Sequence, residues 1–272
     1  MPRISLPDEQ KIIYEDAGNS SPVLLMIHGY TGGRWYYERD VPIFSEKYRC
    51  IAPDLVGHGD SSKPVDRIYS IEQFAKDIDD FAKTLELDRF VLIGHSMGGM
   101  IAQLYALDFN ERRRCVGLVL ISTASEIVMR DAIAGLVRSD LDRYEKGLWK
   151  ANMESERALA RSAWSPAYAE AHPEQVDRAF REFMRVPDIV RLKLMLALAE
   201  FDVSKRVGEI NLPVMVCVGS VDILAEGAYK LAQAIPHARF KRIEGAGHMI
   251  NFEATGAIQR EIYGFLAENF PR

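Results

Sequence analysis

The chain has 272 residues, of which 48% are hydrophobic and 27% are charged, an ordinary composition for a globular protein. This length suits one α/β domain with an insertion. The formal net charge of −5 gives no electrostatic reason to bind nucleic acid or an anionic membrane. The first residues lack the apolar core of a signal peptide and no segment is typical of a membrane span, so we expect a cytoplasmic protein.

The chain has three cysteines, Cys50, Cys115 and Cys217, all in or beside apolar runs. An odd number without a close pair is evidence against a disulfide framework or a zinc site. We therefore expect buried free thiols, with no metal and no cofactor. The only basic cluster runs from Arg112 to Arg114, and we interpret it as a solvated loop.

Short, nearly continuous runs of apolar and β-branched residues predict strands buried on both faces of a parallel sheet. The strong candidates are residues 23–27, 90–93, 116–121 and 214–218, and the weaker ones are 49–52 and 239–243.

Segments with helical spacing of apolar residues lie between these runs. The clearest is 70–86, where Ser70 and Gln73 form a capping box. Residues 97–107 and 257–268 are two more. Strands that alternate with helices imply right-handed crossovers, and we predict a doubly wound, mostly parallel sheet of the α/β class.

The alternation stops between residues 124 and 205. This stretch has no convincing strand, and Pro166, Pro173 and Pro187 divide it into short helical pieces. Strand candidates flank it on both sides. We expect residues 1–123 and 206–272 to form the α/β core and residues 124–205 to form a helical insertion.

Residues 94–98 have the pattern G-x-S-x-G, placed between a buried strand candidate and a helix. A tight strand-to-helix turn forces strained backbone geometry on its central residue and requires neighbours without side chains, which Gly94 and Gly98 provide. The turn would place the Ser96 hydroxyl at the carboxyl end of the sheet, above a helix N-terminus that favours developing negative charge. Ser96 is therefore the candidate nucleophile.

A serine nucleophile needs a base, and the base needs an orienting acid. His248 lies in a glycine-rich loop between the last strand candidate and the last helix, where an imidazole can reach over the edge of the sheet. Asp222 follows the strand candidate at 214–218, again at a carboxyl end. We predict His248 as the base and Asp222 as the acid.

A second glycine-rich loop, residues 28–33, directly follows the strand candidate at 23–27. Attack on a carbonyl creates an oxyanion that requires two preorganised N–H donors. We expect one to be the backbone N–H of Met97, next to the nucleophile, and the other the backbone N–H of Tyr30. His28 is expected to be structural, with its ring hydrogen-bonded to the loop backbone.

With these motifs the chain resembles the α/β-hydrolase family over nearly its whole length, in particular its serine carboxylesterase and lactone hydrolase branch. The order Ser, Asp, His along the chain is that of the family. Residues 53–61 are similar to the family's D-x-x-G-x-G-x-S loop, which is structural there, so Asp54 and His58 receive no chemical role. The resemblance implies that residues 124–205 form a helical cap that supplies most substrate contacts.

The resemblance also limits the reactions that the chain is expected to catalyse. Haloalkane dehalogenases and epoxide hydrolases of this fold have an Asp nucleophile, where this chain has Ser96. Hydrolases that cleave carbon–carbon bonds in meta-cleavage products usually have Asn before the serine and Trp after the histidine; here these positions are His95 and Met249. No Asp or Glu directly follows the strand candidate at 116–121, which is the family's alternative position for the acid, so Asp222 is the remaining candidate.

The residues next to the predicted triad are apolar or aromatic, and we expect Tyr30, Met97, Ile223 and Met249 to contact the substrate. An apolar pocket suits an uncharged acyl ester. The expected function is therefore that of a carboxylesterase, which cleaves small-molecule esters of apolar acyl groups through an acyl-enzyme. A carbon–carbon bond or enol-lactone hydrolase of the same fold, and a non-catalytic ligand-binding relative, are the alternatives.

Arginines of the insertion could reach inward and hold a substrate carboxylate. We expect each of them to be solvated instead, because arginine is rarely buried. The five candidates among the arginines of the insertion are Arg130, Arg138, Arg161, Arg185 and Arg191.

Overall fold

A computed structural model describes residues 1–271 and contains one eight-stranded sheet in the order β1-β2-β4-β3-β5-β6-β7-β8. The two strands at one edge, β1 and β2, are antiparallel to their neighbours, and the other six run parallel. The strands are β1 (Arg3–Ser5), β2 (Lys11–Ala17), β3 (Val23–Ile27), β4 (Cys50–Pro53), β5 (Phe90–His95), β6 (Cys115–Ile121), β7 (Val214–Gly219) and β8 (Arg239–Ile243).

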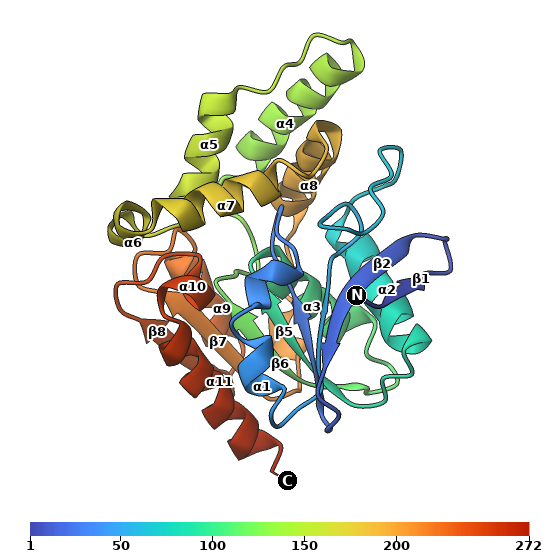
Figure 1. Cartoon of the computed structure of the whole chain (residues 1–272), viewed down its shortest axis with the longest axis vertical. Helices are drawn as coiled ribbons and strands as arrows, with labels where there is room; N and C mark the ends of the chain where they lie inside the picture. The colour runs from blue at the N-terminus through green and yellow to red at the C-terminus, as the bar shows by residue number, and fades with distance from the viewer. Residues whose placement is uncertain (272) are drawn as a thin grey trace.

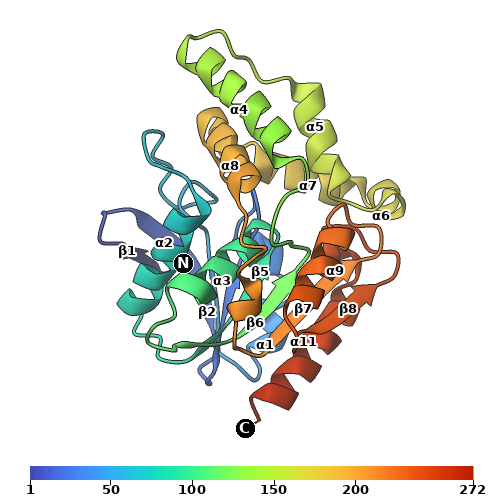
Figure 2. The same cartoon turned by 180° about the vertical axis from the view of Figure 1, so that it is seen from behind.

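Helices cover both faces of this sheet. Figure 1 looks onto the face that carries α1 and α11, and Figure 2 onto the face that carries α2, α3 and α9. These helices and the short ones of the core are η1 (Arg34–Tyr37), α1 (Val41–Phe44), α2 (Ile71–Thr84), α3 (Met97–Asp108), η2 (Val207–Glu209), α9 (Ala225–Ala234), α10 (Ile250–Glu253) and α11 (Thr255–Asn269).

Successive side chains of the central strands point to opposite faces of the sheet and fill two separate apolar cores. Leu25 and Leu92 pack with α2 and α3 on one face, whereas Leu24 and Val91 pack with α11 on the other. Burial on both faces explains why β3, β5 and β7 are continuous apolar runs. The predicted α/β class with a mostly parallel sheet is confirmed.

The strands that the sequence pattern did not predict are β1 and β2. Both lie at the antiparallel edge, and β2 alternates buried residues, such as Ile12 and Tyr14, with more exposed ones. A half-exposed edge strand of this kind lacks the continuous apolar run of a central strand. The predicted capping box is present, since the Ser70 side chain accepts a hydrogen bond of 3.0 Å from the Gln73 N–H at the start of α2.

Five α-helices lie between β6 and β7, and all of them lie above the same end of the sheet in both views (Figures 1 and 2). We refer to them as the cap helices. They are α4 (Arg130–Glu145), α5 (Met153–Ser162), α6 (Pro166–Ala171), α7 (Pro173–Phe183) and α8 (Asp188–Glu200).

Prolines mark three starts among the cap helices: Pro166 and Pro173 are the first residues of α6 and α7, and Pro187 directly precedes α8. This position suits proline, whose missing N–H has no partner in the first turn of a helix. Within residues 1–271, no helix has the length and apolar character needed to cross a membrane.

The three cysteines are buried free thiols, as expected. Burial raises the pKa of Cys115 and of Cys217 to about 12, so neither thiol ionises near neutral pH. The interpretation of the arginine cluster as fully solvated is wrong for one member. Arg114 is buried and pairs with Asp79 of α2, because a buried guanidinium is stable only with a compensating carboxylate.

Candidate active site

Ser96 occupies the sharp turn between β5 and α3. Its φ of 53° and ψ of −117° lie outside the usual regions for a residue with a side chain, so the turn is strained. A Cβ atom on Gly94 would lie 2.3 Å from the Gly98 carbonyl oxygen, and one on Gly98 would lie 2.1 Å from that of Ile27. Both positions therefore require glycine. The hydroxyl of Thr123 donates a 2.8 Å hydrogen bond to the Ser96 carbonyl and steadies the turn from β6.

Asp222 and His248 are joined by a hydrogen bond at the ends of β7 and β8. His248 Nδ1 lies 3.0 Å from Oδ1 and 3.1 Å from Oδ2 of Asp222. Burial raises the pKa of Asp222, but His248 and the Leu224 N–H, which donates at 2.8 Å, lower it more, so the net pKa is below its usual value. Asp222 is thus a carboxylate at neutral pH.

Two short distances show that the loop of His248 lies close both to the end of β7, which precedes Asp222, and to the turn of Ser96. A Cβ atom on Gly219, at the end of β7, would lie 2.1 Å from the carbonyl oxygen of Ala246, two residues before His248. The ring of His95, the neighbour of Ser96, lies 4.8 Å from the ring of His248, measured between centroids. Ser96, Asp222 and His248 therefore lie at the same carboxyl edge of the sheet.

The loop after β3 lies directly against the serine. A Cβ atom on Gly29 would be 3.0 Å from the Cβ of Ser96, so a side chain at this position would crowd the serine. Met97 is the first residue of α3, where a backbone N–H has no partner within the helix. The backbone N–H groups of Tyr30 and Met97 remain the predicted oxyanion donors.

His28 is fully buried, and backbone groups occupy both of its ring nitrogens. Nε2 accepts a 3.0 Å hydrogen bond from the Leu55 N–H, so Nδ1 carries the proton and donates at 2.8 Å to the Gly29 carbonyl. Burial lowers the pKa of His28 and keeps the ring neutral. The predicted structural role of His28 is confirmed.

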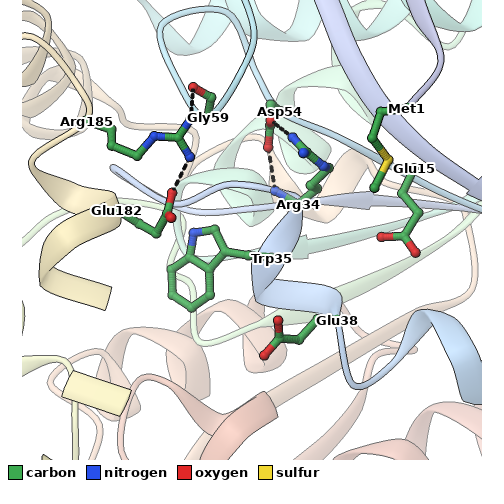
Figure 3. A pocket seen from close by; sticks show the side chains of 9 residues that line it. All are labelled: Met1, Glu15, Arg34, Trp35, Glu38, Asp54, Gly59, Glu182 and Arg185. Carbon is green, nitrogen blue, oxygen red and sulfur yellow. Dashed lines mark hydrogen bonds and ion pairs between the residues drawn. The ribbon is translucent and has the colours of Figure 1, made fainter. Parts of the chain in front are cut away.

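The loop after β4 is also structural. The buried carboxylate of Asp54 accepts hydrogen bonds from the backbone N–H groups of Arg34, at 2.7 Å, and Asp60, at 2.8 Å. It also pairs with the Arg34 guanidinium, as Figure 3 shows. Arg185 of the segment after α7 donates to the Gly59 carbonyl at 3.1 Å beside a cavity of about 300 Å³, and so joins this loop to the cap helices.

A second cavity, of about 380 Å³, lies among the cap helices α4, α5 and α8. Tyr30, whose backbone N–H is one of the two predicted oxyanion donors, lines it, and the Tyr30 hydroxyl donates a 3.4 Å hydrogen bond to the Arg191 carbonyl. Its apolar lining comes from Val137, Trp149, Leu159, Leu192 and Met195, and its charged lining from Asp140, Arg143, Lys150, Glu156, Asp188 and Arg191. Three acidic and three basic side chains leave this cavity without a net charge.

The predicted substrate contacts fall in different surroundings. Tyr30 lines the cap cavity, whereas Met97 and Met249 are buried. Ile223 follows Asp222 and is 72% exposed. The part of each in binding substrate stays a prediction.

The expectation that the cap arginines are solvated is wrong for Arg191, which is only 3% exposed. Its guanidinium lies 2.7 Å from Asp188 and 3.3 Å from Glu156, and it donates at 2.7 Å to the Val186 carbonyl. Two carboxylates offset the cost of burying the charge. The other four candidates, Arg130, Arg138, Arg161 and Arg185, are exposed.

Sequence reasoning did not identify two residues of the site. Gly29 could have been found from its place in the glycine-rich loop 28–33, directly before Tyr30. His95 was noted only for the asparagine it replaces, yet its ring contacts the loop of His248. Nothing in the local pattern indicates a contact between residues 153 positions apart.

Comparison with known proteins identifies the family. Residues 22–255 match the family described as the alpha/beta hydrolase fold. The chain belongs to this family. This α/β hydrolase is 29% identical over 244 residues to 3-oxoadipate enol-lactonase 2 of Acinetobacter baylyi, a match that covers 89% of this chain and 87% of the relative.

Two other proteins match this α/β hydrolase over almost their whole length. A putative carbamate hydrolase of Agrobacterium fabrum is 25% identical and covers 90% of this chain and 93% of the relative. The solved structure of a thermophilic esterase from Thermogutta terrifontis has a TM-score of 0.86 at 24% identity, over 98% of this chain and 99% of that one. The chain is a hydrolase that acts on ester-type bonds.

Proposed function

We propose that this α/β hydrolase is a carboxylesterase that cleaves esters of uncharged acyl groups through an acyl-enzyme on Ser96. The observation that carries the proposal is the hydrogen bond from His248 to Asp222 at the sheet edge where the strained Ser96 turn lies. An oriented imidazole beside a serine turn is the arrangement that nucleophilic acyl transfer requires.

The first half of the reaction forms the acyl-enzyme. Ser96 Oγ attacks the ester carbonyl carbon while its proton passes to Nε2 of His248. The carbonyl oxygen becomes an oxyanion that accepts hydrogen bonds from the N–H groups of Tyr30 and Met97. The tetrahedral intermediate then collapses, the carbon–oxygen bond to the alcohol breaks, and His248 returns the proton to the departing alkoxide.

The second half repeats these steps with water. Water attacks the acyl carbon, its proton passes to His248, and the second intermediate releases the acid as the proton returns to Ser96 Oγ. Asp222 stays ionised throughout and stabilises the imidazolium that forms in each half. Protein groups therefore supply a partner for every proton and for the developing negative charge.

The cavity among the cap helices α4, α5 and α8 suits an uncharged acyl group better than a charged one. Leu159, Leu192 and Met195 give it an apolar wall, and its charged side chains balance. A volume of about 380 Å³ fits a short to medium acyl chain. Because the cavity reaches Tyr30, a chain that extends from an ester carbonyl at the proposed oxyanion site could enter it directly.

Carbon–carbon cleavage of a dienoate would require groups that anchor a carboxylate. Arg191 is the buried one of the five candidate arginines, and Asp188 and Glu156 already neutralise it. A third carboxylate there would meet repulsion from these two. This pairing favours ester cleavage.

A substrate panel tests the proposal. We expect p-nitrophenyl esters from acetate to octanoate to be hydrolysed, with kcat/KM for the best of them at least about a hundredfold above that for a meta-cleavage dienoate, a difference of about 2.7 kcal/mol in transition-state stabilisation. Faster turnover of the dienoate would overturn the proposal. Absence of turnover on every ester would favour a non-catalytic ligand-binding protein.

Enol-lactone hydrolysis is a second candidate, and the match to 3-oxoadipate enol-lactonase 2 over 89% of the chain favours it. A lactone is a cyclic ester, so the same attack on the carbonyl opens its ring. Adding five- and six-membered lactones to the panel separates the two. A lactone kcat/KM above that of every acyclic ester would assign the protein to lactone hydrolysis.

A further inference from the structure

His95 is a buried histidine beside the proposed nucleophile, and it holds the main chain of the proposed base. Its Nε2 lies 2.9 Å from the carbonyl oxygen of His248. A carbonyl only accepts hydrogen bonds, so Nε2 must carry the proton. Nδ1 is then an unprotonated nitrogen, and within residues 1–271 it has no hydrogen-bond partner.

The surroundings of His95 keep it in this one state. Burial, with a further contribution from His248, lowers the pKa of His95 well below its ordinary value, so the ring stays neutral. The Tyr36 ring stacks on it with 4.0 Å between centroids and 19° between planes. A Cβ atom on Gly29 would lie 3.0 Å from Nδ1, so the backbone of the loop after β3 lies close to this nitrogen.

Tyr36 is in turn fixed by a chain of buried polar contacts. Its hydroxyl donates a 3.0 Å hydrogen bond to Asn251 Oδ1, and Asn251 Nδ2 donates a 2.6 Å hydrogen bond to Asp40. Asn251 lies in α10, which directly follows the His248 loop. Tyr36 is therefore held by both η1 and α10, and it presents a fixed ring on which His95 stacks.

We propose that His95 is a positioning residue for the ester cleavage, whose Nε2–H holds the main-chain oxygen of His248 and so sets the base relative to Ser96. The proposal rests on the proposed roles of Ser96 and His248. His95 is joined to Ser96 by one peptide bond and to His248 by one hydrogen bond. It thereby couples the strained turn after β5 to the loop after β8, whereas Asp222 fixes only the rotation of the imidazole.

The test compares three substitutions that change the donor differently. His95→Phe keeps a ring to stack on Tyr36 and removes the donor. His95→Gln places an amide N–H where Nε2 was, and His95→Asn carries the same amide on a side chain too short to reach. For each protein we would measure kcat and KM on p-nitrophenyl butyrate and the rate at which a fluorophosphonate labels Ser96.

Fluorophosphonate labelling reports the serine and base without depending on acyl preference. Ser96 Oγ forms a bond to phosphorus, fluoride leaves, and the serine proton passes to His248. A misplaced base slows this step, and a misplacement of about 1 Å can cost a hundredfold. We expect His95→Phe and His95→Asn to lower both kcat and the labelling rate by about 10- to 100-fold, with KM within about threefold.

Rescue by the longer amide distinguishes positioning from packing. We expect His95→Gln to recover labelling to within about fivefold of wild type, because one hydrogen bond restores the geometry. Wild-type labelling in His95→Phe would overturn the proposal. Equal rates in the Gln and Asn variants would overturn it as well, and this pair carries the test if His95→Phe does not fold.

His58 provides a matched control. It is also fully buried, Nδ1 lies 3.2 Å from the Val56 carbonyl, and its other nitrogen has no partner among the described residues. His58→Phe should cost stability but leave the labelling rate of the folded protein near wild type. Wild-type protein that is not labelled at all would contradict the proposed function itself. Labelled wild type with unaffected His95 variants, or with equal rates in the Gln and Asn variants, would contradict this inference alone.

Discussion

Both carboxylate oxygens of Asp222 lie within hydrogen-bonding distance of one nitrogen of His248, with Nδ1 3.0 Å from Oδ1 and 3.1 Å from Oδ2. An ionised carboxylate only accepts hydrogen bonds, so Nδ1 must carry the proton. In the neutral ring Nε2 is then the unprotonated nitrogen, which is the state that a base for Ser96 needs.

Asp222→Asn should lower kcat by about 10⁴ while changing KM far less. The amide can turn its NH₂ toward Nδ1 and stabilise the imidazole tautomer that has its proton on Nε2. Steady-state kinetics on p-nitrophenyl butyrate measures the effect. A kcat near that of wild type would point to another acid, and Glu126, which follows β6, would be the next candidate.

Gly98→Ala should destabilise the protein and reduce its activity, because the new Cβ would lie 2.1 Å from the Ile27 carbonyl oxygen. The atom that the new Cβ would meet belongs to the backbone, which cannot move aside as a flexible side chain can. Gly135→Ala in α4 is the control: nothing lies within 4 Å of its Cβ, and alanine favours a helix over glycine by about 1 kcal/mol. Thermal unfolding should give a lower Tm for the first variant and an equal or higher one for the second, and the reverse order would refute the tight turn.

Three buried histidines should make the fold sensitive to acid. Burial lowers the pKa of His28, His58 and His95, so below about pH 6.5 the unfolded chain binds protons that the folded chain does not. Each such histidine lowers the free energy of unfolding by up to about 1.4 kcal/mol for each pH unit below this value. Urea unfolding between pH 7 and pH 5 measures the slope.

The acid slope can be assigned to particular residues. His58→Phe should remove about one third of the histidine contribution, whatever it does to stability at pH 7. Asp40 acts with the opposite sign: burial raises its pKa to about 6, so its contribution to stability falls as the pH rises from about 4 to 6. If the free energy of unfolding of the wild-type protein did not change between pH 7 and pH 5, this result would contradict the burial of neutral imidazoles.

Treatment with EDTA should leave esterase activity unchanged. Every proton transfer and the oxyanion in the proposed reaction are assigned to side chains and backbone N–H groups. Activity assays after extensive dialysis against the chelator, with and without added Zn²⁺ or Mg²⁺, test this assignment. Loss of activity that returns with a metal would require a different mechanism.

The sequence predicted best where a local pattern has one structural solution. Continuous apolar runs such as 90–93 fit strands buried on both faces, and glycines on either side of Ser96 fit a tight turn. The burial of Arg191 could not be predicted in this way, because it depends on ion pairs with Asp188 and with Glu156, and Glu156 lies on another helix. The contact of His95 with the His248 carbonyl likewise exists only once the sheet brings two distant loops together.

Replacement of Ser96 by alanine tests the central claim most directly. The substitution removes one oxygen at a turn whose geometry Gly94 and Gly98 already permit, so we expect Tm to change little. The nucleophile, base and acid act as a unit, so kcat on p-nitrophenyl butyrate should fall by about 10⁴ to 10⁶. More than a tenth of wild-type turnover in the folded variant would contradict Ser96 as the nucleophile.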